Sequence, residues 1–181
     1  MKSLAILTSL ICLGVAGGAR AEVLDSQTGG FTVRESQVVN APIRTVWDAL
    51  VRPAAWWSSS HTFSHDARNL SLVAKPGGFW LETLPGGGGV RHLVVVYVDP
   101  PSTLRLEGAL GPLQAFGVAG HLTFALKDQG GGTLITETYD VGGHAPGGLD
   151  KISAVVDHVL GEQLDRLKTL SETGKTPDDS K

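Results

Sequence analysis

The sequence predicts one α+β domain in which an antiparallel sheet of about seven strands is followed by a long C-terminal helix. Short apolar segments, each ended by Pro- or Gly-rich turn residues, succeed one another between residues 31 and 141. This spacing is typical of antiparallel hairpins. Beyond residue 149 the apolar residues recur at helical spacing instead. The chain has 181 residues, of which 41% are apolar, and this is enough for one well-packed core.

Composition excludes several classes of protein. At 181 residues the chain is too long for a disulfide miniprotein and too short for two full domains. Its formal net charge of −3, from 15 Lys and Arg against 18 Asp and Glu, is not basic enough for a nucleic-acid-binding protein. We therefore expect no nucleic-acid partner.

The N-terminus has the features of a secretory signal peptide in the right order. Lys2 precedes an apolar run that continues to Val15, and Ala19-Arg20-Ala21 then forms an A-x-A cleavage site. The run contains polar residues and glycines and is shorter than the roughly 20 residues of a membrane-spanning helix. We expect residues 1–21 to be removed during export to the periplasm, with full secretion as the second choice.

Cleavage after Ala21 also changes the chemistry of the chain. It removes Lys2, Arg20 and Cys12, the single cysteine, and lowers the formal net charge from −3 to −5. A mature protein without a thiol has no disulfide, no Cys-ligated zinc and no cysteine nucleophile. No other apolar stretch is long enough to cross a membrane, so no stable membrane insertion is expected after cleavage.

Turn residues divide the mature chain into elements. A first strand is expected at 31–39, and two short helices follow it, one after Asn40 as cap and Pro42 in its first turn, the other at 54–57. The first of these helices is expected to end near Pro53. Six further strands are expected at 70–74, 79–84, 90–98, 103–109, 118–127 and 133–141.

A long amphipathic helix is expected from Leu149 to Leu170. Its apolar residues fall on one stripe, and Gly161 interrupts it, at a cost of about 1 kcal/mol relative to Ala. A glycine there also lets a neighbour or ligand approach the helix closely. The polar residues 174–181 are expected to be a disordered tail, so the domain spans 22–173.

Four short motifs occur in an order that resembles a known superfamily. They are Val39-Asn40-Ala41-Pro42-Ile43 with Val46-Trp47, Pro76-Gly77-Gly78-Phe79-Trp80, Val98-Asp99-Pro100 with Leu104, and Gly132-Thr133. Together they resemble the START-like superfamily called SRPBCC, especially its branch of polyketide cyclases and Hsp90-ATPase activators. The resemblance implies the helix-grip fold, in which a curved sheet wraps around the last helix and encloses a cavity.

The resemblance implies a hydrophobic or amphipathic small-molecule ligand, and it implies no single reaction. The superfamily includes lipid carriers, hormone binders, aromatic polyketide cyclases and oxygenase domains, so the function depends on the residues of the site. An exported member also departs from the cytosolic roles of chaperone activation and polyketide assembly.

Aromatic residues are the first candidates for the walls of such a cavity. Trp56 and Trp57 are expected at its rim, because two adjacent side chains rarely both bury, whereas Trp80 fits the cavity and plain core packing equally well. The other candidate walls are Phe63, Tyr97, Phe116 and Tyr139. The apolar segment from Leu110 to Phe116 is either a gate over the cavity or a small helix that closes the core, and we favour the gate.

Three histidines and one glutamate are candidates for polar contacts or chemistry. His61 and His65 flank Phe63 in a serine-rich loop, and His92 lies near the start of a long strand. A shared metal is one interpretation, but a loop does not fix an i,i+4 pair on one face, so we expect no metal and no other cofactor.

Glu82 shares a strand face with Trp80, and it is equally consistent with a cavity position and an outward one. For Glu137 we favour an outward position, reached by a one-residue shift and paired with Arg91 or Arg105.

These observations support three functional hypotheses. The first is a periplasmic protein that binds or carries a hydrophobic molecule, oriented by His61, Glu82 and His92. The alternative is a cyclase- or dehydratase-type enzyme that uses Glu82 with His61 or His92 as an acid-base pair. The third is an interaction module whose cavity is filled by its own side chains. The sequence does not specify an oligomeric state.

Overall fold

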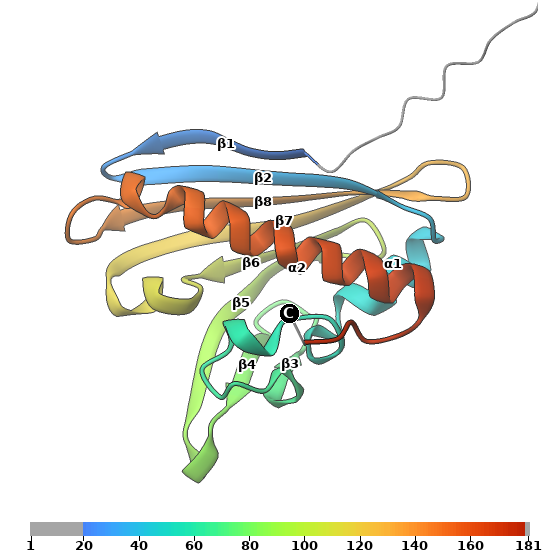
Figure 1. The fold of residues 1–181 in the computed structure, drawn as a ribbon, viewed down its shortest axis with the longest axis horizontal. Helices are drawn as coiled ribbons and strands as arrows, with labels where there is room; N and C mark the ends of the chain where they lie inside the picture. Colours follow the sequence, from blue (N-terminus) through green and yellow to red (C-terminus); the bar gives the residue numbers. More distant parts are fainter. Residues whose placement is uncertain (1–19, 180–181) are drawn as a thin grey trace, which may run out of the picture.

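A single open sheet of eight antiparallel strands forms the body of the protein (Figure 1). The computed structural model describes residues 20–179, and the strand order is β1-β2-β8-β7-β6-β5-β4-β3. The strands are β1 (Arg20–Gln27), β2 (Gly30–Val39), β3 (Leu70–Leu72), β4 (Phe79–Thr83), β5 (Gly89–Asp99), β6 (Thr103–Gly108), β7 (Gly117–Asp128) and β8 (Thr133–His144). Seven of them match the predicted strands.

The eighth strand, β1, is absent from the sequence prediction. Its eight residues include only two large apolar side chains, Val23 and Leu24, and Leu24 is 39% exposed. An edge strand with one weakly buried face carries little of the alternation by which strands are recognised. β1 also begins at Arg20, inside the predicted cleavage site. The rest of the predicted signal peptide, residues 1–19, lies outside the described residues.

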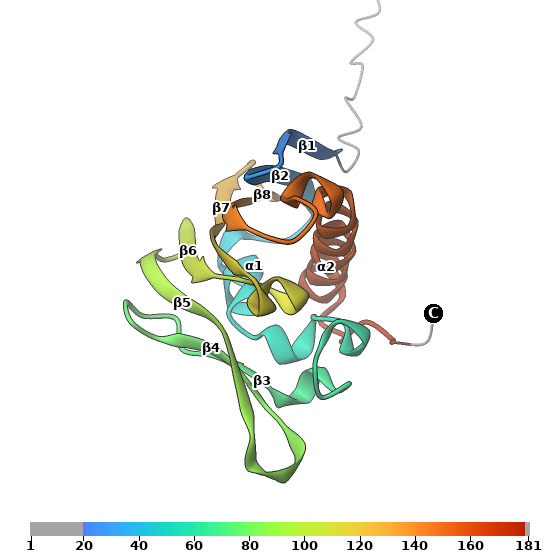
Figure 2. The same ribbon diagram turned by 90° about the vertical axis from the view of Figure 1, so that its left-hand side faces the viewer.

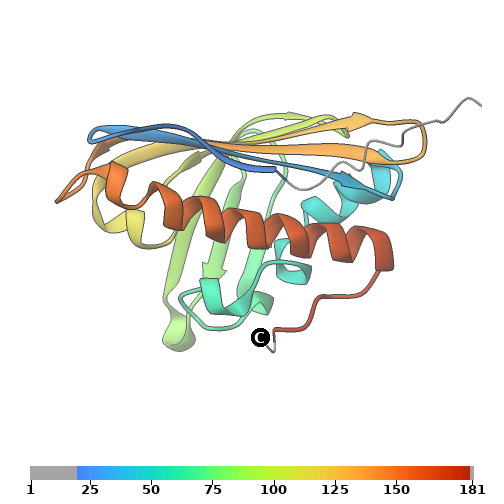
Figure 3. The same ribbon diagram turned by 45° about the horizontal axis from the view of Figure 1, so that its top comes forward.

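Two α-helices lie on the concave side of the sheet. The long helix α2 (Ser153–Thr173) runs along the β1-β2-β8 part, and α1 (Ile43–Leu50) lies at one end of it (Figures 1 and 3). Figure 2 shows the sheet curving around both helices. This is the predicted helix-grip arrangement.

The short helical segments are all 3-10 turns. They are η1 (Pro53–Ala55), η2 (Ser59–His61), η3 (Ala67–Asn69), η4 (Pro85–Gly87), η5 (Gly111–Ala115) and η6 (Leu149–Lys151). Those that directly follow α1, η1 to η3, lie together with η5 beside the part of the sheet that α2 leaves open, whereas η4 connects β4 to β5 and η6 leads into α2. The predicted second short helix corresponds to η1, which ends just before Trp56. The cap of α1 differs from the prediction, because Pro42 is the N-cap residue and no side chain caps the helix.

Two β-bulges on β5 decide which of its side chains face the interior. The β4 partners of Leu93 and Arg91 are consecutive residues, so His92 has no partner on β4. Likewise, Val96 has no partner on β6, because the register passes directly from Val95 to Tyr97. A bulge inserts one extra residue and re-aims the side chains beside it. The alternation of β5 therefore breaks twice.

The C-terminal segment is described up to Asp179. Gly174 ends α2 in a left-handed conformation, and the chain then returns toward the η2 region. Arg166 of α2 donates hydrogen bonds to the backbone oxygens of Pro177 and Asp178 and to the carboxylate of Asp179. The predicted disordered tail thus has defined contacts as far as Asp179, and residues 180 and 181 lie outside the described part.

Candidate ligand pocket

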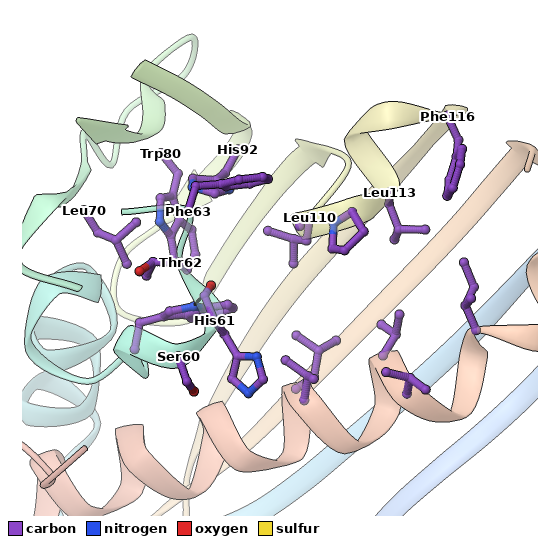
Figure 4. A pocket seen from close by; sticks show the side chains of 18 residues that line it. Ser60, His61, Thr62, Phe63, Leu70, Trp80, His92, Leu110, Leu113 and Phe116 are labelled. Atoms are coloured by element: carbon purple, nitrogen blue, oxygen red, sulfur yellow. Dashed lines mark hydrogen bonds between the residues drawn. The ribbon is translucent and has the colours of Figure 1, made fainter. Parts of the chain in front are cut away.

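An apolar cavity of about 410 Å³ lies between α2, the η5 turn and the segment that carries His61 to Phe63 (Figure 4). A volume of this size suits a drug-sized organic molecule. Most of the lining is aliphatic or aromatic, and the few polar side chains come from η2, Thr62 and β5. The lining residues are Trp57, Ser60, His61, Thr62, Phe63, Leu70, Trp80, His92, Leu110, Gly111, Pro112, Leu113, Phe116, Ile152, Val155, Val156, Val159 and Leu160.

Helix α2 supplies one complete wall of the pocket. Val155, Val156 and Val159 lie on one face of the helix together with Leu160, and all of them line the cavity. The 3.6-residue period places positions three and four apart on the same side of a helix. Part of the apolar stripe predicted for this helix therefore lines the pocket.

Three tryptophans pack together beside the pocket, and two of them line it. The ring centroids of Trp57 and Trp80 are 5.1 Å apart, and Trp56 lies 5.4 Å from Trp57 and 6.0 Å from Trp80, all in edge-to-face geometry. Trp56 is 1% and Trp57 7% exposed, so the expectation that two adjacent tryptophans would not both bury is wrong. Trp57 and Trp80 line the cavity, whereas Trp56 packs behind them.

Adjacent tryptophans can both bury here because each indole N–H has a backbone acceptor. Trp56 donates from Nε1 to the carbonyl oxygen of Leu50, and Trp57 donates to that of His61. With their polar atoms satisfied, both rings pack as apolar surface.

Exposed apolar side chains surround the mouth of the pocket. Phe63 is 50% exposed, Phe116 38% and Val155 63%, and they come from three different segments. Apolar surface gathered around an opening is typical of a binding site. The segment expected as a gate forms the η5 turn, and Leu110, Leu113 and Phe116 point from it toward the cavity (Figure 4).

A buried Glu82–His92 pair adjoins the apolar walls. His92 Nε2 lies 2.9 Å from Glu82 Oε2, and the other bonds to this carboxylate come from the backbone N–H groups of Phe63 and Ser64. Glu82 is 1% exposed and faces the same side as Trp80, so the inward alternative for Glu82 is correct. Only His92 of the pair lines the cavity, since Glu82 lies behind it.

The hydrogen bonds determine the charge and the tautomer of the pair. Burial tends to raise the pKa of Glu82, but the bonds from Ser64, His92 and Phe63 outweigh it and lower this pKa. Burial lowers the pKa of His92, although Glu82 partly opposes the shift. An ionised carboxylate only accepts, so His92 donates through Nε2 and keeps Nδ1 as an acceptor. Gln114 Nε2 lies 3.5 Å from Nδ1 on the opposite side of the ring.

The β-bulge in β5 explains how His92 reaches this position. Leu93 already faces inward opposite Trp80, so regular alternation would turn His92 to the outer face. As the extra residue of the bulge, His92 instead shares the inner face, where its ring lies 6.0 Å from that of Phe63.

His61 lines the pocket as well and is paired with an acidic residue of α2. Its Nε2 lies 3.1 Å from Glu162 Oε2 of α2. His65 has a positive φ of 57° and is not among the lining residues. Between residues 20 and 179, no three His, Cys, Asp or Glu side chains are grouped so as to hold a metal ion.

Two of the expected aromatic walls lie elsewhere. Tyr97 is 47% exposed on the outer face and packs under Arg105, because the bulge at Val96 reverses the alternation of β5. Tyr139 is fully buried, but its hydroxyl donates to Gly108 O and accepts from Leu110 N. Tyr139 therefore ties β8 to the start of the η5 segment and does not line the cavity.

The outward position favoured for Glu137 is wrong. Glu137 is 1% exposed and faces inward from β8, directly opposite Glu35 on β2. β8 keeps a regular alternation from Thr133 to Val141, so no register shift turns Glu137 outward. Arg91 and Arg105 instead stack over Phe79 and Tyr97 on the outer face.

Several lining residues were not predicted from the sequence. Nothing in the residue types of Ser60, Thr62 and Leu70 indicates a ligand pocket. The α2 residues could have been recognised only from their helical spacing, which places them on one face. Glu35, a buried carboxylate in the first predicted strand, was not predicted either.

The fold and the pocket define a helix-grip protein with a ligand-sized internal cavity. Residues 30–172 match the sequence profile of the family described as polyketide cyclase / dehydrase and lipid transport. The chain therefore belongs to this family, within the SRPBCC superfamily. No curated protein sequence matches the chain. Between residues 20 and 179, no helix is long and apolar enough to span a membrane.

Solved structures with the same fold include proteins from several bacteria. CalU16 from Micromonospora echinospora is 16% identical, with a TM-score of 0.59 over 88% of this chain and 86% of its own. An uncharacterized protein from Rhizobium leguminosarum is 20% identical, with a TM-score of 0.60 over 85% and 97%. DynU16, from the dynemicin biosynthetic locus, is 24% identical, with a TM-score of 0.56 over 82% of this chain and 50% of its own. At these identities the similarity shows the fold.

The Glu82–His92 pair leads to a spectroscopic prediction. We expect nitrogen-detected NMR of the imidazoles to find His92 as the Nε2–H tautomer, with a pKa below 6.5. Glu82→Gln should lower this pKa further, because the carboxylate is the group that raises it. The same titration of urea-unfolded protein supplies the reference. An unchanged or higher His92 pKa in Glu82→Gln would contradict the assigned hydrogen bond.

Proposed function

We propose that the protein binds a hydrophobic or amphipathic small molecule in the cavity between the sheet and α2. The observation that carries the proposal is the cavity of about 410 Å³, with aliphatic and aromatic walls and polar side chains on one side only. Such a lining favours a ligand with a large apolar body and one polar end. Membership of a family that includes lipid-transport proteins supports this function.

The polar side chains of the pocket suit orientation of the ligand. His92 offers an acceptor at Nδ1, while Ser60 and Thr62 have hydroxyl groups at the same side of the cavity. The Glu82 carboxylate is engaged by two backbone N–H groups and by His92, so it has little capacity left for a ligand. Glu82 is therefore a positioning residue in this proposal.

A second candidate function is acid-base catalysis in the same cavity, and the Glu82–His92 geometry favours it. A carboxylate that holds one nitrogen of a neutral imidazole keeps the other nitrogen as a proton acceptor, and at Nδ1 of His92 a substrate proton would compete with the long 3.5 Å contact from Gln114 Nε2. The roles differ from the acid-base pair predicted from sequence, because His92 would act as the base and Glu82 would orient it. His61 would contribute only at the polar rim.

We also propose that the protein is exported to the periplasm. The proposal rests on the charge, apolar run and A-x-A order of residues 1–21. N-terminal sequencing of the protein from cell fractions should find Glu22 as the first residue, in the periplasmic fraction. Cleavage there would leave Glu22–Gln27 of β1 paired with β2. An intact N-terminus on protein from the cytoplasmic fraction would contradict export.

We expect a larger side chain in the cavity to weaken ligand binding. Val156→Phe places a larger apolar side chain on the α2 wall, so we expect the affinity for the neutral fluorophore N-phenyl-1-naphthylamine to fall by about tenfold or more. Val96→Phe, on the exposed bulge of β5, is the matched control and should bind like the wild type. The measurement is a fluorescence titration, with thermal unfolding of each variant. Equal affinity of both variants would place the fluorophore outside this cavity.

The catalytic candidate predicts a loss of turnover without loss of binding. If His92 is a base, His92→Gln should convert a substrate about 10²–10⁴-fold more slowly while still retaining it. The measurement is mass spectrometry of a small-molecule extract of the producing cells, incubated with wild type or variant. A species consumed by the wild type and spared by His92→Gln would support catalysis. No consumption, with retention by both proteins, would leave binding as the function.

A further inference from the structure

The three tryptophans beside the apolar pocket differ in the hydrogen bonding of their indole N–H groups. Trp56 donates to the carbonyl oxygen of Leu50, and Trp57 donates to that of His61. Between residues 20 and 179, Trp80 Nε1 has no hydrogen-bond acceptor, although the side chain is only 1% exposed. The indole N–H of a buried tryptophan usually has a partner, and an unpaired buried donor is unfavourable. The protein itself therefore leaves this donor unsatisfied.

The indole nitrogen of Trp80 faces the cavity. Among residues 20–179, no side-chain nitrogen is both sealed in the core and without a partner, so Trp80 Nε1 keeps some accessible surface. Trp80 lies on the inner face of β4 and lines the cavity, as Figure 4 shows. Because almost all of the remaining side chain is buried, this small surface belongs to the cavity. The indole N–H is thus available to a bound molecule.

Thr62 supplies an acceptor on the same side of the cavity. Its hydroxyl donates to the carbonyl oxygen of Ser59 at 2.8 Å. A hydroxyl group has one hydrogen, so Thr62 Oγ1 can offer only its lone pairs to a molecule in the cavity that it lines. The pocket therefore combines one unused donor with an acceptor.

The residues that flank Thr62 are held beside Trp80. The carbonyl oxygen of His61 accepts from Trp57, whose ring centroid lies 5.1 Å from that of Trp80. The N–H of Phe63 donates to the carboxylate two residues beyond Trp80 on β4. Figure 4 shows Thr62 and Trp80 on the same side of the cavity. Donor and acceptor therefore belong to one polar region.

The cavity offers no cation to a bound anion. No lysine or arginine is among the described residues that line it. Burial lowers the pKa of His92, and its Nε2–H is engaged by the Glu82 carboxylate, which places a negative charge behind the lining. His61 already pairs with Glu162 of α2. Because an unpaired carboxylate is far costlier to bury than a hydroxyl group, the pocket disfavours anionic ligands.

We propose that the apolar pocket takes a neutral hydroxyl compound, an alcohol or a phenol, whose oxygen accepts the indole N–H of Trp80. The proposal rests on the proposed binding function and names the class of ligand. A hydroxyl group both accepts and donates, so it satisfies Trp80 and has a hydrogen for the Thr62 oxygen. A hydrocarbon would leave the N–H of Trp80 unpaired, and a carboxylate would enter without a cation. Trp80 is therefore the residue that determines specificity.

The test compares three compounds with the same apolar body as competitors of bound N-phenyl-1-naphthylamine at pH 7.5. They are 4-tert-butylphenol, which is neutral at this pH, tert-butylbenzene and 4-tert-butylbenzoate. We expect the dissociation constant of the phenol to be about tenfold lower than that of the hydrocarbon, the effect of one added hydrogen bond to an otherwise unpaired donor. The benzoate should bind about tenfold or more weakly than the phenol.

Two tryptophan variants form a matched pair. Trp80→Phe keeps an aromatic wall and removes the N–H, so the preference for the phenol over the hydrocarbon should fall to about twofold or less while the hydrocarbon still binds. Trp56→Phe removes an indole N–H that Leu50 already accepts, and Trp56 does not line the cavity, so the tenfold preference should remain. Thermal unfolding of both variants shows whether they are folded.

NMR of the indole N–H groups tests the same contact in the wild-type protein. Saturation with 4-tert-butylphenol should move the Trp80 Nε1–H proton signal downfield, as formation of a hydrogen bond does, and saturation with tert-butylbenzene should not. Trp47 and Trp56, which do not line the cavity, supply reference signals. This measurement decides the proposal even when Trp80→Phe does not fold.

Three results would overturn the proposal. Equal affinity of the wild type for the phenol and the hydrocarbon, or an unchanged preference in folded Trp80→Phe, would remove Trp80 as the anchor and leave the binding function intact. Tightest binding of the benzoate would indicate an anionic ligand instead. Failure of all three compounds and of N-phenyl-1-naphthylamine to bind would contradict the binding function together with this proposal.

Discussion

The central constraint of this structure is that one long helix covers only part of a curved eight-stranded sheet. α2 packs along the β1-β2-β8 part, where Leu160, Leu164 and Leu167 are buried. The concave face beside β4 and β5 is left to short turns and to three tryptophans. These fill the remaining space incompletely, and the apolar cavity is the result. Burial of the same α2 stripe thus stabilises the fold and forms one wall of the pocket.

The sequence predicts the fold well because its signals are periodic. The order of seven strands and the C-terminal helix follows from alternation, turn residues and the change of period near Leu149. The site is harder to predict, because single-residue irregularities decide it. The bulge at His92 turns that side chain inward, and the bulge at Val96 turns Tyr97 outward. Neither bulge has a Gly or Pro signal in the sequence. Burial of both Trp56 and Trp57 depends on backbone acceptors that the fold alone supplies.

Two buried glutamates on the inner face of the sheet have opposite surroundings. Glu82 receives two backbone N–H groups and the His92 ring, so it is stable as an anion and fixes the orientation of that ring. Glu35 has Gly161 above it, Glu137 beside it and the carboxyl of Asp157 as its hydrogen-bond partner, and burial and the charge of Asp157 raise its pKa to about 7. The chemistry of a buried carboxylate therefore depends on the donors around it. Glu82 therefore serves the apolar pocket, whereas Glu35 lies beneath α2 beside Asp157 and takes no part in that pocket.

The central claim is that the apolar cavity holds a small molecule, and native mass spectrometry of the protein purified from its producing cells tests it most directly. The account predicts a complex heavier than the chain alone, from which denaturation releases one hydrophobic or amphipathic compound. The account would be contradicted if the spectrum showed only the mass of the unliganded chain and the protein also failed to bind any apolar molecule added to it. The cavity would then be closed by the protein's own side chains in solution.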